Sequence, residues 1–116
     1  MTPHAAIRER YLRDKPEIRL GGLASNLARI KSFSSHPDHQ DEVAQLLEES
    51  AFFIEWTAGD LPDDDKPILV DLQRLLVRWR RSWHLIWPNH NRRDEVAQEA
   101  GLWSQRILRL AGLLSD

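Results

Sequence analysis

Apolar residues recur at three- and four-residue intervals along most of the chain, and no stretch sustains the strict alternation typical of a β-strand. This spacing predicts a short lead-in helix over residues 3–13 and four long helices after it. The second predicted helix covers residues 16–34, and the third begins after a break at residues 35–38 and runs to about Thr57. The last two cover residues 66–87 and residues 92–114.

The predicted connections fix how the helices run in space. Each link has only a few residues, so consecutive helices must run antiparallel. Pro16 suits a first helical turn, Gly59 is a typical C-terminal stop, and Pro88 cannot continue the helix before it. We therefore expect an all-α protein, an up-down-up-down four-helix bundle with a short N-terminal lead-in helix, in one domain over residues 1–116. The pair Gly21-Gly22 is a point where the second helix could break.

Each long helix has one apolar face, and together these faces suffice for a single core. Trp79 and Trp83 could stack as a cofactor platform, but core packing is the preferred interpretation. A row of small residues on the second helix predicts close approach of a neighbouring helix: Gly21, Ser25, Ala28 and Ser32. The expected core of the last three helices is Val43, Leu46, Leu47, Ser50, Phe53, Ile54 and Thr57; Ile68, Leu72, Leu75, Leu76, Trp79, Trp83 and Ile86; and Val96, Ala100, Trp103, Ile107, Leu110 and Leu114.

Two aromatic side chains do not fit this plain bundle. Phe52 and Trp56 lie four residues apart on the polar side of the third helix, flanked by Glu49 and Glu55. One interpretation is that the lead-in segment folds over them. The other is that they form a contact surface for a protein partner or for a second copy of the chain, because exposed aromatic patches are typical of interfaces. The sequence leaves both open.

Charge is distributed unevenly along the chain. Residues 1–35 carry a net charge of +4, residues 36–65 carry −10 with no basic residue, and residues 66–116 carry +4. The acidic segment can stabilise the bundle by pairing with its basic neighbours, or it can present an anionic face to a cationic partner. Internal pairing is the preferred interpretation.

Composition excludes several classes of protein. The chain has no cysteine, which excludes disulfides, zinc–thiolate sites and thiol nucleophiles and favours a cytoplasmic protein. Its net charge of −2 is unlike that of most nucleic-acid binders, and no window approaches the ~18 apolar residues of a membrane span. The cluster of His36, Asp38, His39 and Asp41 matches no dedicated metal site. Neither a metal nor another cofactor is therefore predicted.

An arginine row marks the fourth predicted helix. Arg74, Arg78 and Arg81 follow one another along one side of it, close to His84. Arginine suits bidentate contacts to carboxylate or phosphate. The step from Arg78 to His84 resembles the Arg-x4–6-His motif of HEPN ribonucleases, which are helical bundles of similar length, and this resemblance implies RNA binding or cleavage. On one continuous helix, however, Arg78 and His84 point about 120° apart. A solvated face beside the third helix is the preferred interpretation.

A second resemblance covers nearly the whole chain. The runs Arg10-Tyr-Leu-Arg-Asp14, Arg19-Leu-Gly-Gly-Leu-Ala24, Leu27-Ala-Arg-Ile30 and Phe53-Ile-Glu-Trp-Thr57, with Trp103-Ser104, are similar to a group of short, uncharacterised cyanobacterial proteins. The resemblance implies a self-contained cytoplasmic helical protein and brings no activity, cofactor or catalytic residue with it.

The function hypothesis from the sequence is a non-enzymatic helical bundle that acts through protein–protein contacts, with another protein or as a homodimer. The predicted partner-binding residues are Phe52, Trp56, Glu49 and Glu55, and no catalytic residue is predicted. The alternative is an RNA-binding or HEPN-like ribonuclease bundle that uses Arg74, Arg78, Arg81 and His84. A small-ligand site between the second and fourth helices is a third possibility, which requires a pocket.

Overall fold

The computed structural model describes residues 3–113, and within that range it contains helices and turns but no strand. The prediction of an all-α protein is confirmed. Leu114, the predicted end of the last helix, lies outside the described residues. The α-helices are α1 (Pro3–Leu12), α2 (Pro16–Phe33), α3 (Gln40–Thr57), α4 (Lys66–Arg81), α5 (Trp83–Ile86) and α6 (His90–Leu110), and two 3-10 turns, η1 (Pro37–His39) and η2 (Ala58–Asp60), follow α2 and α3.

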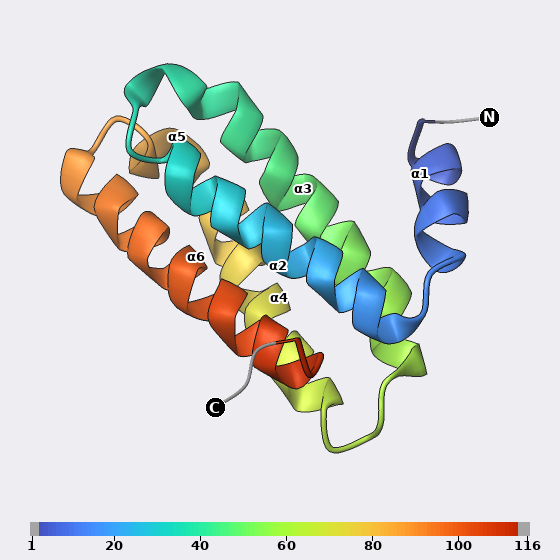
Figure 1. Cartoon of the computed structure of the whole chain (residues 1–116). Coiled ribbons are helices and arrows are strands. Elements are labelled where there is room, and N and C mark those ends of the chain that lie inside the picture. The colour runs from blue at the N-terminus through green and yellow to red at the C-terminus, as the bar shows by residue number, and fades with distance from the viewer. Residues whose placement is uncertain (1–2, 114–116) are drawn as a thin grey trace.

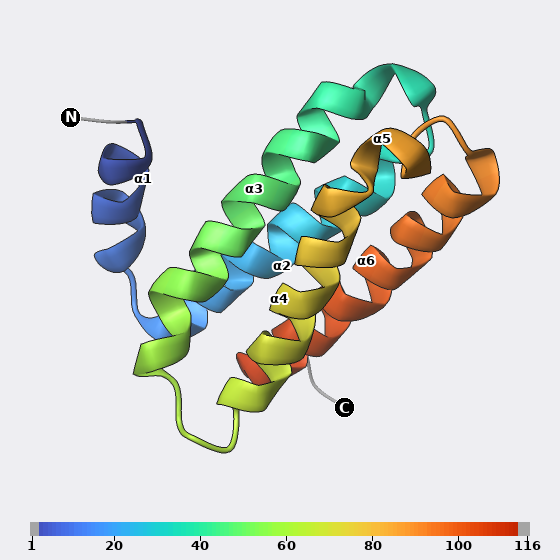
Figure 2. The same ribbon diagram turned by 180° about the vertical axis from the view of Figure 1, so that it is seen from behind.

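Three of the long helices form one layer, and the fourth lies across its back (Figures 1 and 2). α2 occupies the middle of the layer and packs closely against α6 on one side and α3 on the other. α4 contacts α3, whereas its backbone approaches that of α6 much less closely. The described chain measures 41 × 37 × 20 Å, and its thickness equals about two helix diameters. The side between α4 and α6 is therefore the open side of the helix assembly.

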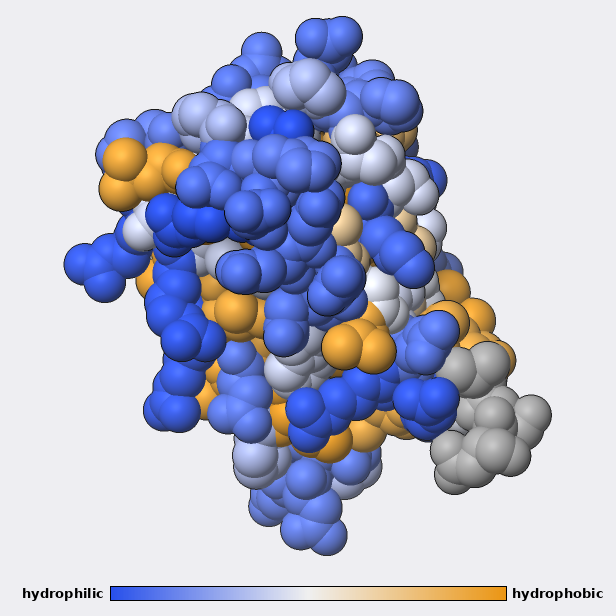
Figure 3. Space-filling view, turned by 90° about the vertical axis from the view of Figure 1, so that its left-hand side faces the viewer, coloured by the Kyte–Doolittle hydropathy of each residue, from blue (hydrophilic) through white to orange (hydrophobic). Residues whose placement is uncertain are grey.

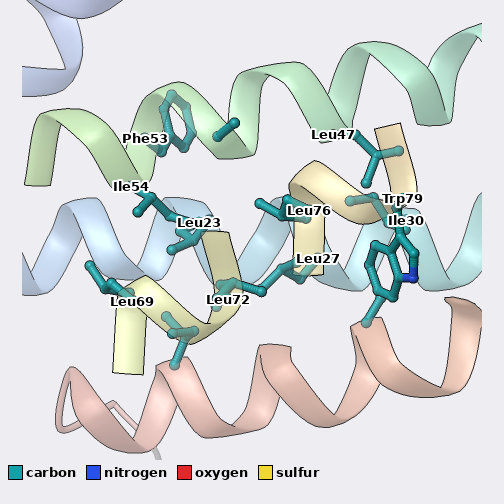
Figure 4. Packing of buried hydrophobic residues seen from close by; sticks show 14 of the residues in the cluster. Leu23, Leu27, Ile30, Leu47, Phe53, Ile54, Leu69, Leu72, Leu76 and Trp79 are labelled. Atoms are coloured by element: carbon teal, nitrogen blue, oxygen red, sulfur yellow. The ribbon is translucent and has the colours of Figure 1, made fainter. Parts of the chain in front are cut away.

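The core lies where α4 crosses the α2–α3 pair. Figure 4 shows leucines of α4 pointing at leucines and isoleucines of the two helices beneath it. Their apolar faces have the spacing that the sequence predicted, and burial of these faces from water is the main force that holds the helices together. The labelled residues are Leu23, Leu27 and Ile30 of α2, Leu47, Phe53 and Ile54 of α3, and Leu69, Leu72, Leu76 and Trp79 of α4.

The fourth predicted helix is interrupted, which corrects the prediction of one helix over residues 66–87. The backbone of Ser82 has φ −108° and ψ 14°, outside helical geometry, and α5 is a separate single turn. This change of direction buries Trp83, Ile86 and Trp87. The indole N–H of Trp87 then donates a hydrogen bond to the carbonyl oxygen of Pro37 at 2.8 Å. The free energy gained by burying three large apolar side chains outweighs the cost of interrupting the regular helix.

The tryptophans of this region belong to the core. Trp79 and Trp83 are both buried, which confirms the core interpretation. The ring of Trp83 lies against that of Trp87, with centroids 5.3 Å apart and an angle of 45° between the planes. Aromatic pairs favour such tilted arrangements over a parallel sandwich.

The glycine pair in α2 does not break the helix. A Cβ atom at Gly22 would meet Tyr11 at 3.7 Å and Phe53 at 3.9 Å, and one at Gly21 would meet Leu113 at 3.1 Å. Gly21 therefore makes room for the side chain of Leu113, and Gly22 for the rings of Tyr11 and Phe53. The prediction that a helix packs along the whole small-residue row is wrong, because three of its members face solvent: Ser25, Ala28 and Ser32.

Tyr11 attaches α1 to the rest of the protein. Its ring stacks on Phe53 with centroids 3.9 Å apart. Its hydroxyl donates to the carbonyl oxygen of Arg19 at 2.7 Å and accepts from the hydroxyl of Thr57 at 3.3 Å. Burial of this phenol disfavours its ionised form and raises the pKa of Tyr11 to about 12.

We expect this raised pKa to make the protein less stable at alkaline pH. Below pH 10 the phenol is protonated in both the folded and the unfolded chain, so its contribution is complete. Between pH 10 and about 12 the unfolded chain loses the proton first, and the free energy of unfolding falls by up to roughly 2–3 kcal/mol. Tyr11→Phe lacks this part of the pH dependence.

The sequence contains one tyrosine, so phenolate absorbance in the folded protein reports Tyr11 alone. Absorbance titration and chemical denaturation across the same pH range measure the two expected effects. A midpoint near 10 in the folded protein, or the same alkaline loss of stability in Tyr11→Phe, would contradict the prediction.

Candidate interaction surface

The aromatic pair predicted to contact a partner is half-buried beneath α1. The ring of Phe52 lies 4.6 Å from that of His4 and 5.4 Å from that of Trp56, measured between centroids. Tyr11 approaches Trp56 at 5.9 Å, and Ile7 shares with both aromatics a small cleft of about 190 Å³. α1 thus packs beside Phe52 and Trp56, which is the first of the two arrangements that the sequence left open.

The four predicted partner-binding residues do not form one patch. Glu49 lines the α1 cleft and accepts a hydrogen bond from the side-chain amide of Asn26 at 3.2 Å. Glu55 is exposed and faces the other way, toward α4. The sequence analysis grouped the four because Glu49 and Glu55 flank the aromatic pair, but Glu49 lies beside α1 whereas Glu55 faces α4.

A long groove follows the open side between α4 and α6. Its first stretch has a volume of about 890 Å³, and a second of about 700 Å³ continues it; Leu75, Arg78 and Glu99 line both. Figure 3 looks onto the side that carries α6, where hydrophobic surface shows in gaps between hydrophilic side chains. We call this feature the α4 groove. Its lining is Ile54, Glu55 and Ala58 from α3 and η2; Val70, Asp71, Gln73, Arg74, Leu75, Val77, Arg78, Trp79 and Arg81 from α4; Ser82 and Ile86; and Arg92, Glu95, Val96, Glu99 and Trp103 from α6.

The arginine row lies along this groove, but His84 does not. Arg74, Arg78 and Arg81 are exposed on α4 and line the α4 groove. His84 belongs to α5, beyond the change of direction at Ser82, and lines neither stretch. The two residues of the HEPN-like spacing are therefore not brought into one pocket.

Carboxylates accompany the arginines. Asp71 on α4, Glu55 on α3, and Glu95 and Glu99 on α6 line the same groove as four arginines. Within the described part of the chain none of these eight side chains forms an ion pair. The groove therefore presents both signs of charge over an apolar floor, with hydrogen-bonding capacity that solvent or a partner must satisfy.

Internal pairing of the acidic segment, the preferred interpretation of the sequence, accounts for few of its charges. In the described chain, three contacts between basic and acidic side chains join it to a helix outside the segment: the ion pairs Arg19–Asp60 and Lys66–Asp63, both at 2.9 Å, and the contact of His4 with Glu48 at 3.4 Å. Five of its carboxylates are exposed without such a link: Asp38, Asp41, Glu42, Glu55 and Asp64. Lys66 beside Asp63 lowers the pKa of that carboxyl, an interaction confined to the start of α4. Much of the acidic surface is thus available to solvent or a partner.

The groove contains apolar residues that the sequence analysis did not single out. Val70 and Val77 on α4 are 44% and 42% exposed, and Trp103, assigned to the core, is half-buried at the groove with Arg106 over its ring at 4.6 Å. The two valines lie on the polar side of the α4 helical wheel. A search of that wheel for apolar residues on the polar side, which identified Phe52 and Trp56 on α3, would have identified them too. Nothing in the sequence showed that α6 stands away from α4 and leaves Trp103 accessible.

Neither a metal site nor a membrane span emerges from the described residues. No three potential ligands among histidine, aspartate and glutamate come together over residues 3–113. None of the helices in that range combines the length and the apolar character needed to cross a bilayer.

No protein-family model, curated protein or solved structure matches the chain. The resemblance to short cyanobacterial proteins therefore stays a prediction, and the functional argument rests on the α4 groove itself.

Proposed function

We propose that this protein is a non-enzymatic, cytoplasmic helical bundle that acts through protein–protein contacts. In this proposal the four long helices form an up-down-up-down bundle that is opened along its α4–α6 side, and the α4 groove is the docking surface. The observation that carries the proposal is the combination of an apolar floor with unpaired charges of both signs along one open groove. Interfaces join an apolar centre to a polar rim in the same way.

The shape and chemistry of the groove favour a helical partner. A groove between two helices accepts the apolar face of a third, whose side chains at three- and four-residue spacing fill it. Trp103 offers a large anchor at the floor, and residues such as tryptophan and arginine dominate binding energy at interfaces. Glu99 and Arg78 on opposite sides would each select an opposite charge on the partner.

The RNA-binding alternative has one supporting observation, the exposed row of Arg74, Arg78 and Arg81. Phosphate binding depends on an excess of positive charge. In the α4 groove the carboxylates of Glu95, Glu99 and their neighbours offset that excess. The protein-binding proposal is therefore the better supported of the two.

Site-specific photocrosslinking in the native host tests the proposal. A benzophenone amino acid replaces Val77 in the groove, and the matched control replaces Ile18, an exposed apolar residue of α2. We expect a protein adduct of defined mass from position 77 only, resistant to ribonuclease and lost when Arg78→Glu and Glu99→Lys are introduced. Equal labelling from both positions would overturn the proposal, and a ribonuclease-sensitive adduct would favour the RNA alternative.

A further inference from the structure

The outer face of α4 carries a strip of residues whose chemistry repeats with a seven-residue step. Val70 and Val77 are seven residues apart, and so are Asp71 and Arg78. Seven residues are about two helical turns, with a drift of only about 20°, so each pair lies along one line of the helix. The two valines run along one side of the strip and the charged pair along the other, with Arg74 between them. Figure 2 shows α4 at the front of the molecule, with no other element over it.

This strip is complementary to itself when two copies meet in opposite directions. A two-fold axis between antiparallel helices keeps each side of the strip facing the same side of the partner. With the axis close to Arg74, Val70 lies opposite the partner's Val77, and Asp71 lies opposite the partner's Arg78. Symmetry forms each of these contacts twice. The valines then lose the exposure of 44% and 42% that they have in the single chain.

The ends of α4 reinforce the same direction. The loop before α4 holds Asp63, Asp64 and Asp65, whereas Arg78 and Arg81 lie in its last turn. The helix has 16 residues and is about 24 Å long. An antiparallel partner places its basic end over this acidic loop, and receives the same contact at its own acidic end. Parallel pairing would instead set acidic end against acidic end.

We propose that the partner that docks on the outer face of α4 is a second copy of this chain, with the two α4 helices antiparallel about a two-fold axis near Arg74. The inference rests on the proposed function and names its partner. Arg74 opposes its own counterpart across the axis, and this like-charge contact is the one unfavourable feature of the arrangement. The dimer is therefore expected to strengthen when that charge is removed.

Light scattering on a sizing column across protein concentrations tests the dimer. The full chain should reach twice 13.5 kDa, with a dissociation constant that rises with ionic strength. Asp71→Arg and Arg78→Asp each create two like-charge contacts and should weaken the dimer about 30- to 100-fold. Arg74→Ala should tighten it severalfold. Arg29→Asp, an exposed charge reversal on α2, is the control and should change nothing.

A mixing experiment separates this geometry from damage to the fold. The Asp71→Arg and Arg78→Asp chains are each expected to be monomeric alone. Mixed together they should form a heterodimer, because each reversed charge then faces the opposite sign on its partner. The double variant Asp71→Arg/Arg78→Asp should dimerise as the unaltered chain does.

A monomeric mass at every concentration would overturn the dimer. So would a dimer that is indifferent to both reversals, or reversed chains that fail to combine. If the chain is monomeric and Val77 crosslinks to a different protein, the proposed protein-binding function stands and only the dimer is refuted. If the chain is monomeric and no Val77-specific crosslink forms, both the dimer and the proposed function are refuted.

Discussion

Leu27→Ala is expected to lower the free energy of unfolding by about 3–5 kcal/mol. Leu27 is fully buried in α2, the helix that packs against α3 on one side and α6 on the other. Because α3 and α6 flank α2, and α4 crosses it at Leu27 (Figure 4), the cavity left by the missing methyl groups cannot close without moving a whole helix. The loss of unfolding free energy at this central position is therefore expected to lie in the upper part of the range usual for buried Leu→Ala substitutions.

Urea denaturation followed by tryptophan fluorescence measures this effect, since five tryptophans report the unfolding. Leu102→Ala is the matched control, because the same side chain on α6 is 64% exposed and its removal should change stability by less than about 0.5 kcal/mol. Similar losses at the two positions would contradict the packing around α2.

Arg19→Met should destabilise the fold by about 2–4 kcal/mol. Arg19 is buried near the start of α2, with 6% of its surface exposed. Its guanidinium donates to the carbonyl oxygen of Asp14 at 3.0 Å, to that of Trp56 at 3.2 Å, and to the carboxylate of Asp60 at 2.9 Å. Methionine fills a similar volume but leaves both carbonyl oxygens without these donors. The positive charge also lies at the C-terminal end of α3, where the helix dipole favours it.

Asp60→Asn separates the two parts of this interaction. More than half of the Asp60 side chain is exposed, so the ion pair itself should contribute less than about 1 kcal/mol. Denaturation of both variants at neutral pH gives the comparison. An Asp60→Asn loss as large as that of Arg19→Met would show that the ion pair, and not the contacts to the backbone, carries the stability.

The helices themselves followed from local patterns. Leu20, Leu23, Leu27 and Ile30 predicted the buried face of α2, and all four are buried. Pro16 and Thr57 were correctly placed at a helix start and a helix end. Such features depend on residues only a few positions apart, so the sequence contains what is needed to find them.

Local patterns carried no signal where distant residues decide the geometry. The change of direction at Ser82 follows from the burial of Trp83 beside α3 and of Trp87, whose indole N–H reaches Pro37 in η1, 50 residues away along the chain. Gly21 and Gly22 stay helical because the packing around α2 compensates their low helix propensity. Neither effect has a local signal.

The candidate site likewise has features that the sequence shows and features that only the packing of the helices determines. The sequence contained the arginine row and the aromatic pair on the polar side of α3, because both are visible on a helical wheel. It did not show that α1 packs beside Phe52 and Trp56, or that α4 stands away from α6 and opens a groove. Rotation about one helix axis places a side chain on a face, whereas only the packing of other helices determines whether that face is covered.

The sequence by itself thus determined the helical class, most helix boundaries and most residues of the core, because hydrophobic periodicity is a property of short segments. The tertiary structure alone decided which polar faces stay open, since that depends on how closely helices remote in sequence approach one another. The α4 groove exists because α2, and not α4, lies closest to α6.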